Sequence, residues 1–194
     1  MHFEYPAGAT PIDPDEAHGL KIGWVTVQLE LNALEQENIT AAQLWLASKR
    51  THDVLTERFV QVLHKRMFND VWLWAGTFRR TNKNIGVAWQ QIPTQLRLLL
   101  DDTRYWCAHK TYSWDEIAAR FHHRLVSIHC FPNGNGRHAR LATDALCLHY
   151  GVPLFSWGAD PSGLRYGEIR TAYIRSLREA DAQDYGALLR FVRG

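Results

Sequence analysis

The sequence predicts an all-α protein built as one domain, because helix start signals, helical apolar spacing and helix stop signals recur along the chain. Ser113-x-x-Glu116 has the capping-box pattern of a helix start, and apolar residues follow at helical spacing over 117–128. Residues 137–150 repeat that spacing and stop at Gly151. We therefore expect two helices separated by a short loop.

The remaining segments extend the helical pattern. Pro93 suits the first turn of a helix, and the apolar stripe over 53–68 predicts a long amphipathic helix. Thr40-x-x-Gln43 resembles a second capping box. β-Forming residues alternate around a glycine in one segment, which predicts a short β-hairpin. The other expected elements are an irregular arm over the first 20 or so residues, a short helix from Val25 to Gln36, the hairpin within 78–92, and a helix marked by Ile169, Tyr173 and Leu177.

The composition is that of a folded domain. The chain has 194 residues and 46% hydrophobic content, enough for one buried core. Its net charge of +2 creates no strong field that would attract nucleic acid. Three cysteines without metal spacing indicate a reducing compartment. With no signal-peptide pattern and no apolar run of membrane-spanning length, we expect a cytoplasmic protein without a direct nucleic-acid or membrane partner.

The run from His129 to Arg140 combines the groups needed to hold a polyphosphate and to accept a proton beside it. It falls at the N-terminus of a predicted helix, where unpaired N–H groups and the macrodipole favour anions. Glycines in such a turn permit left-handed angles and close ligand approach, and arginines supply planar forks for phosphate oxygens. His129 ends the preceding helix, and an imidazole there can act as a general base. The anion-binding candidates are Gly134, Asn135, Gly136, Arg137 and Arg140.

These residues resemble the Fic family, which includes the related Doc toxins. The family signature is His, any residue, Phe, any residue, Asp or Glu, Gly-Asn-Gly-Arg, any two residues, then Arg. The chain matches it at His129, at Phe131 and throughout 134–137, and again at Arg140. The likeness extends over about residues 40–194, which predicts a Fic-type helical domain preceded by an N-terminal arm and candidate inhibitory helix over 1–39. The run over 30–39 is similar to a subgroup named mobile mystery protein B.

The resemblance implies a protein adenylyltransferase that moves AMP from ATP to a Ser, Thr or Tyr hydroxyl of a target protein, with Mg²⁺. His129 would take the hydroxyl proton, and the motif glycines and Asn135 would hold the phosphates. Arg137 and Arg140 would bind the outer phosphates. The family's hairpin flap, represented here by Ile85, Gly86 and Val87, would pair with an extended target segment.

Two further positions bear on activity and its control. The family's metal-binding carboxylate is replaced by Asn133, which can offer only an uncharged amide oxygen to Mg²⁺. Many relatives carry an inhibitory helix whose glutamate pairs with the second motif arginine. Glu37 followed by Asn38 fits the end of that pattern, although Ala33 occupies its Ser/Thr position. Glu37 is therefore the predicted regulator and Arg140 its partner, and the toxin relatives imply an antitoxin or other regulator.

Alternative functions remain open within this framework. Asn133 is compatible with a catalytically weak nucleotide-binding or regulatory module, and Doc-type relatives imply a phosphotransferase. A cysteine hydrolase based on Cys130 lacks an orienting partner, because adjacent residues on one loop rarely align as nucleophile and base. The spacing of His122, His123 and His129 matches no zinc motif.

Overall fold

The computed structural model describes residues 14–23, 25, 28–48, 53–158 and 166–194. Over these residues the regular structure is helical, apart from one antiparallel bridge between Leu20 and Trp72. The all-α prediction is therefore confirmed. The elements are α1 (Pro14–Ala17), α2 (Gln28–Ser48), α3 (Glu57–Phe68), the 3-10 turn η1 (Trp89–Gln91), α4 (Ile92–His109), α5 (Trp114–Ile128), α6 (Asn135–Tyr150), α7 (Tyr166–Asp181) and α8 (Gly186–Arg193).

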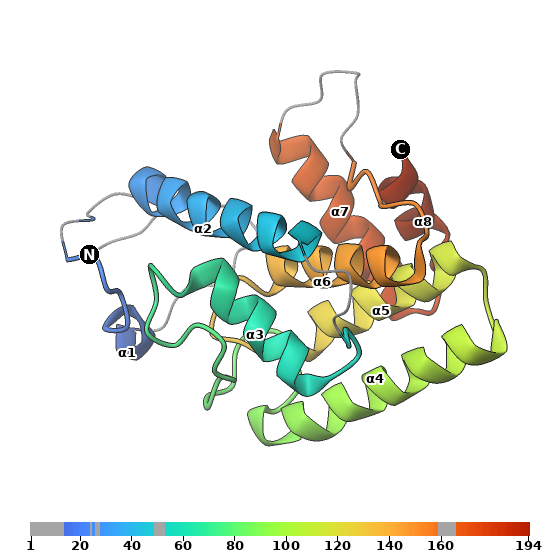
Figure 1. The fold of residues 1–194 in the computed structure, drawn as a ribbon, viewed down its shortest axis with the longest axis horizontal. Helices are drawn as coiled ribbons and strands as arrows, with labels where there is room; N and C mark the ends of the chain where they lie inside the picture. Colours follow the sequence, from blue (N-terminus) through green and yellow to red (C-terminus); the bar gives the residue numbers. More distant parts are fainter. Residues whose placement is uncertain (1–13, 24, 26–27, 49–52, 159–165) are drawn as a thin grey trace.

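Helices α5 and α6 form the centre of the fold and lie side by side (Figure 1). Helix α4 packs along α5, while α3 contacts both α6 and α2. Helices α7 and α8 pack on each other, and α8 contacts the far side of α5. The main apolar core lies between α2, α3, α4, α5 and α6, and a smaller cluster joins α7 and α8 to the central pair. This packing fixes the α5–α6 junction, where the motif lies.

Local sequence signals account for the helices around that junction. The Ser113 hydroxyl accepts a hydrogen bond from the Glu116 N–H at 3.3 Å, as the capping-box prediction requires. Pro93 lies in the first turn of α4, and Gly151 ends α6 in the left-handed conformation. The amphipathic helix α3 begins later than predicted, because Thr56 accepts from the Phe59 N–H and caps it.

The second capping-box prediction is wrong. Thr40 lies inside α2, one continuous 21-residue helix, and its hydroxyl donates to the Gln36 carbonyl at 2.9 Å. A threonine that bonds to the carbonyl four residues earlier is compatible with a helix interior, so the pattern did not mark a start. Helix α2 consequently continues through the boundary drawn between residues 39 and 40. The predicted N-terminal arm falls largely on residues 1–13, outside the described residues.

The predicted β-hairpin is also wrong, because residues 77–88 contain no strand. We call these residues the flap segment. Its backbone groups bond to the end of α5 and to a buried arginine instead of to each other. The Val87 N–H donates to the Ile128 carbonyl at 3.4 Å, and the Arg79 N–H donates to the Cys130 carbonyl at 3.0 Å. Those partners satisfy the segment without a ladder.

None of the helices in the described part of the chain combines the length and the apolar content needed to cross a membrane.

Candidate active site

His129 ends α5 in a left-handed conformation with φ 56°, so its backbone turns out of the helix axis. Its side chain is buried, with only 4% of the residue exposed. Burial lowers the pKa of His129 to about 4, and the nearby charges of Arg79 and Lys83 act in the same direction. The imidazole is therefore neutral at pH 7, the protonation state that a general base requires.

The flap segment covers this imidazole. Gly86 has φ 98°, and a Cβ added there would lie 2.6 Å from the Cβ of His129. Only a glycine permits both the angle and the approach. Ile85 is exposed and Val87 is half-buried, and Gly86 between them is the flap residue that lies against the His129 side chain. The base is thus closed off in this conformation.

The turn after His129 is shaped by helix α3. Gly134 has φ 76°, and a Cβ added there would lie 2.6 Å from the Phe68 ring. Gly136, in contrast, lies in the first turn of α6, with nothing within 4 Å of an added Cβ. The predicted left-handed angle is thus required at Gly134 but not at Gly136. The open space beside Gly136 leaves the start of α6 accessible to an anion.

The Asn135 side chain, predicted to hold phosphates, is hydrogen-bonded within the loop. Its side-chain oxygen accepts from the Phe131 N–H at 2.9 Å, and its amide donates to the Phe131 carbonyl at 2.8 Å. Both polar atoms therefore close the loop on itself, and the residue is buried. Asn135 shapes the anion-binding turn instead of offering its side chain to a phosphate.

The backbone carbonyl of Asn133 is hydrogen-bonded by His64. Its carbonyl lies 3.1 Å from Nε2 of His64, while Nδ1 of His64 accepts from the Gly76 N–H at 3.0 Å. Since Nδ1 accepts, Nε2 carries the proton and donates to the loop. Burial holds the pKa of His64 well below its ordinary value, which keeps the ring neutral and leaves Nδ1 able to accept from Gly76. The ring also stacks on Phe131 with centroids 3.7 Å apart.

The residues present do not make a magnesium site by themselves. The side-chain oxygen of Asn133 already accepts from the Gly134 N–H at 2.6 Å. Within the described residues, no three His, Cys, Asp or Glu side chains form a group suited to a metal ion. Mg²⁺ sites normally rely on one or two carboxylates together with substrate phosphates.

Arg137 forms an ion pair with a glutamate that the sequence analysis did not select. Its Nη1 donates to Oε2 of Glu35 at 2.7 Å, and the other oxygen of Glu35 accepts from the Trp72 indole N–H, also at 2.7 Å. The Glu35 side chain is 5% exposed, whereas that of Arg137 is 38% exposed. Helix α2 therefore places a doubly bonded carboxylate on the first motif arginine.

The predicted pairing of Glu37 with Arg140 is not formed. Glu37 is exposed, and among the described ion pairs none joins it to Arg140. Residues two positions apart on a helix face different directions, so only one of Glu35 and Glu37 can reach the motif. The family pattern pointed to α2, but the glutamate of that helix that contacts a motif arginine is Glu35, which pairs with Arg137.

Arg140 lies against aromatic rings on the opposite side of the junction. Its guanidinium lies over Tyr173 at 4.4 Å and over Trp157 at 5.9 Å from the ring centroids. The Tyr173 hydroxyl is 2.8 Å from Nε2 of the buried His122. The Nε of Arg140 is buried without a hydrogen-bond partner in the described part of the structure. This N–H group can therefore donate to an anion that enters the site.

Three site residues were missed because their signals depend on tertiary contacts. Glu35 resembles its solvated neighbours in sequence, and Arg79 lies in a segment rich in polar residues. His64 follows ordinary helical spacing on α3. His138, inside the motif, is buried and hydrogen-bonds the Val60 carbonyl at 2.9 Å. No sequence spacing would have separated these residues from their neighbours.

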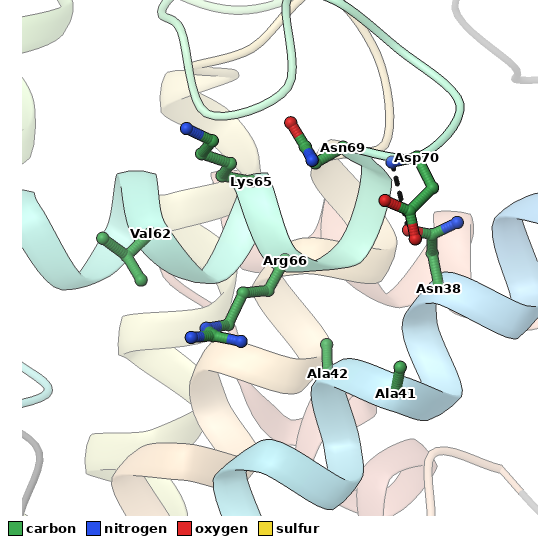
Figure 2. A pocket seen from close by; sticks show the side chains of 8 residues that line it. All are labelled: Asn38, Ala41, Ala42, Val62, Lys65, Arg66, Asn69 and Asp70. Carbon is green, nitrogen blue, oxygen red and sulfur yellow. Dashed lines mark hydrogen bonds between the residues drawn. The ribbon is translucent and has the colours of Figure 1, made fainter. Parts of the chain in front are cut away.

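A surface groove lies elsewhere, between α2 and α3 (Figure 2). It has a volume of about 450 Å³ and includes no motif residue. In Figure 2, Asn38 and Asp70 meet where the Asp70 N–H donates to the Asn38 side chain at 3.3 Å. The lining residues are Asn38, Ala41, Ala42, Val62, Lys65, Arg66, Asn69 and Asp70.

The chain is similar to named proteins of known family. A curated relative, "Protein adenylyltransferase Fic" of Aedes aegypti, is 30% identical over 106 residues, covering 53% of this chain and 21% of the relative. Fic-1 from C. elegans has a solved structure with 26% identity and a TM-score of 0.68, covering 90% of this chain and 51% of that one. BepC from Bartonella tribocorum, solved with bound AMPPNP, has 17% identity and a TM-score of 0.65, covering 91% of this chain and 95% of that one.

The curated relatives are much longer proteins, and the chain spans less than a third of their length. The match to the Fic/DOC family covers residues 54–147, from the start of α3 to the last part of α6. That range contains His129, the turn at 134–136, both motif arginines and the flap segment. Over these residues, the chain matches the Fic/DOC family.

Proposed function

We propose that this chain transfers AMP from ATP to a hydroxyl side chain of a target protein. The observation that carries the proposal is the meeting of a neutral imidazole at the end of α5 with an arginine-flanked anion turn at the start of α6. The names of the curated adenylyltransferase relatives support the same reaction.

The reaction follows from the positions of these groups. His129 accepts the proton of the target hydroxyl, and the resulting oxygen attacks the α-phosphorus of ATP. The bond between the α-phosphorus and the bridging oxygen breaks, so pyrophosphate leaves and AMP remains on the target. The start of α6 binds the phosphates through its N–H groups and dipole. Arg137 and Arg140 bind the outer phosphates and stabilise the charge on the leaving group. Mg²⁺, when present, would neutralise further phosphate charge, and Asn133 is its weak candidate ligand.

We further propose that α2 restrains this site. A triphosphate that uses Arg137 has to compete with Glu35, whose carboxylate already holds that guanidinium. The flap segment must also open, because it covers His129. A regulator such as an antitoxin protein would act by holding or releasing α2. In this proposal Glu35 replaces Glu37 as the inhibitory residue.

A second candidate is a nucleotide-binding module with little transfer activity. It is favoured by Asn133, which brings no charge and whose side-chain oxygen is bonded within the loop. Such a module would bind ATP at the same turn without modifying a protein.

Labelled ATP separates these functions. The chain and its Glu35→Gln variant would be incubated with a cell lysate and ATP labelled at the α- or the γ-phosphorus. We expect α-label on protein, more of it with Glu35→Gln, and none with His129→Ala. Transfer of γ-label alone would replace the proposal with a phosphotransferase. ATP binding without either label would favour the nucleotide-binding module.

A further inference from the structure

Arg79 is a buried cation that binds backbone carbonyls. The residue is 2% exposed, and burial lowers the pKa of its guanidinium. Its Nε donates to the His129 carbonyl at 2.6 Å, and its Nη1 donates to the Thr81 carbonyl at 2.8 Å. Its Nη2 donates to the carbonyls of Val87 and Ile128. One side chain therefore joins two segments of backbone that are distant in sequence.

The first of these segments is the end of α5. The last carbonyls of a helix have no partner within the helix, and they carry the negative end of its dipole. The Arg79 guanidinium satisfies two of them and supplies the favourable charge. By fixing the carbonyl of His129, it restricts the backbone angles of that residue, and these angles set the direction in which the imidazole leaves the chain.

The second segment is the flap. Thr81 and Val87 lie on either side of its exposed tip, and both carbonyls bond to the same guanidinium. Gly86, next to Val87, approaches so closely that an added Cβ would lie 2.9 Å from Nη2 of Arg79. A shift of the flap would therefore move the donors that fix His129.

We propose that Arg79 is a positioning residue that ties the orientation of the base to the conformation of the flap segment. The inference rests on the proposed function, because it assigns Arg79 a part in the transfer that His129 starts. Arg79 binds no substrate itself. The turn that would hold the phosphates has separate supports, in the bonds of His64 to Asn133 and of Asn135 to Phe131. Loss of Arg79 should thus impair proton abstraction without weakening nucleotide binding.

The test uses the full chain with Arg79→Lys and Arg79→Gln. Lysine keeps the charge but cannot reproduce the fork that reaches four carbonyls. Arg104→Lys is the matched control, because Arg104 also donates to a distant backbone carbonyl, that of Leu55, but lies away from the motif. Transfer kinetics, AMPPNP affinity, thermal stability and hydrogen exchange would be measured for each protein.

For both Arg79 variants we expect kcat to fall by about a hundredfold, the scale of a misplaced reacting group. AMPPNP affinity should stay unchanged, and amides over 77–88 and 128–131 should exchange faster together. Arg104→Lys should show none of these changes. Gly86→Ala provides a second route if the Arg79 variants do not fold. Its Cβ would meet both the His129 side chain and the Arg79 guanidinium, so the flap has to move away from them, and kcat should fall in the same way.

Several results would overturn the inference. One is a loss of AMPPNP affinity in parallel with kcat, which would mean general damage to the site. Another is unchanged kcat, and a third is faster exchange in the flap alone, with 128–131 unaffected. If the unaltered chain transfers no AMP, the proposed function fails, but the joint exchange of the two segments still decides whether Arg79 couples them.

Discussion

The two ends of the candidate site are stabilised by different kinds of contact. At the base end, the Arg79 side chain bonds to backbone carbonyls among the described residues, and these partners lie within the part of the chain that matches the family. At the phosphate end, Arg137 pairs with Glu35, which precedes that matched part and lies on α2. The contacts at the base end therefore lie within the matched part of the chain, whereas the carboxylate at the phosphate end comes from outside it. In the proposed function, α2 therefore acts on nucleotide binding and not on the base.

Removing the base should have the largest effect. His129→Ala is expected to lower the transfer rate by about 10²–10⁴, the usual contribution of a general base, while AMPPNP binding persists. His149→Ala, at an exposed histidine, is the matched control and should leave the rate unchanged. Equal transfer rates for His129→Ala and the unaltered chain would show that His129 is not the base.

Acid should lower the free energy of unfolding, because a neutral buried histidine lies near each end of the site. Burial lowers the pKa of His129 and of His138 to about 4, from 6.5 in the unfolded chain. Between pH 6.5 and 4, these two histidines therefore bind protons in the unfolded chain but not in the folded chain. Stability is fully present above pH 6.5 and is lost as the pH falls towards 4. Each such histidine contributes a slope of about 1.4 kcal/mol per pH unit within that window.

Urea unfolding at pH 7, 5.5 and 4.5 would measure this slope. His138→Gln should lower this slope by the contribution of one histidine, about 1.4 kcal/mol per pH unit. A free energy of unfolding that stayed constant down to pH 4.5 would contradict the buried neutral state.

Releasing the phosphate end should have a moderate effect. Glu35→Gln keeps an acceptor for the Trp72 indole but removes the charge that holds Arg137. A charged hydrogen bond contributes about 1.5–3 kcal/mol, so ATP should bind about tenfold tighter or more. Calorimetric titration with AMPPNP would measure the change.

The matched control for that prediction is Glu37→Gln, on the same helix but exposed to solvent. It should leave the affinity unchanged. Tighter binding with Glu37→Gln and not with Glu35→Gln would restore the pairing first predicted from the sequence.

The smallest effect is expected at the turn between the two ends. Asn133→Asp retains an oxygen for the Gly134 N–H and adds the charge that Mg²⁺ prefers. The transfer rate at limiting Mg²⁺ should rise, and the double variant with His129→Ala should stay inactive. A rate that does not respond to Asn133→Asp at any Mg²⁺ concentration would show that the metal does not limit the reaction.

The sequence predicted what depends on local chemistry. Ser113 as a cap, Gly151 as a helix end and the loop between the helices at His129 were all recognisable, because each depends on neighbouring residues. The contacts of Glu35 and Arg79 were not, because they join residues 102 and 50 positions apart in sequence. The hairpin was overpredicted for the same reason, since its backbone bonds to α5 and not to itself.

Because α2 is one unbroken helix, Glu35 can move away from Arg137 only in limited ways. Leu31 and Ile39, four residues to either side, are buried on the same face of that helix. An unbroken helix transmits motion along its axis, so the carboxylate cannot swing away by a bend at one residue. Displacing it would strip apolar neighbours from the core at a cost of about 1.5–3 kcal/mol each. Arg137 should therefore be either fully paired with Glu35 or fully released from it, with no intermediate arrangement.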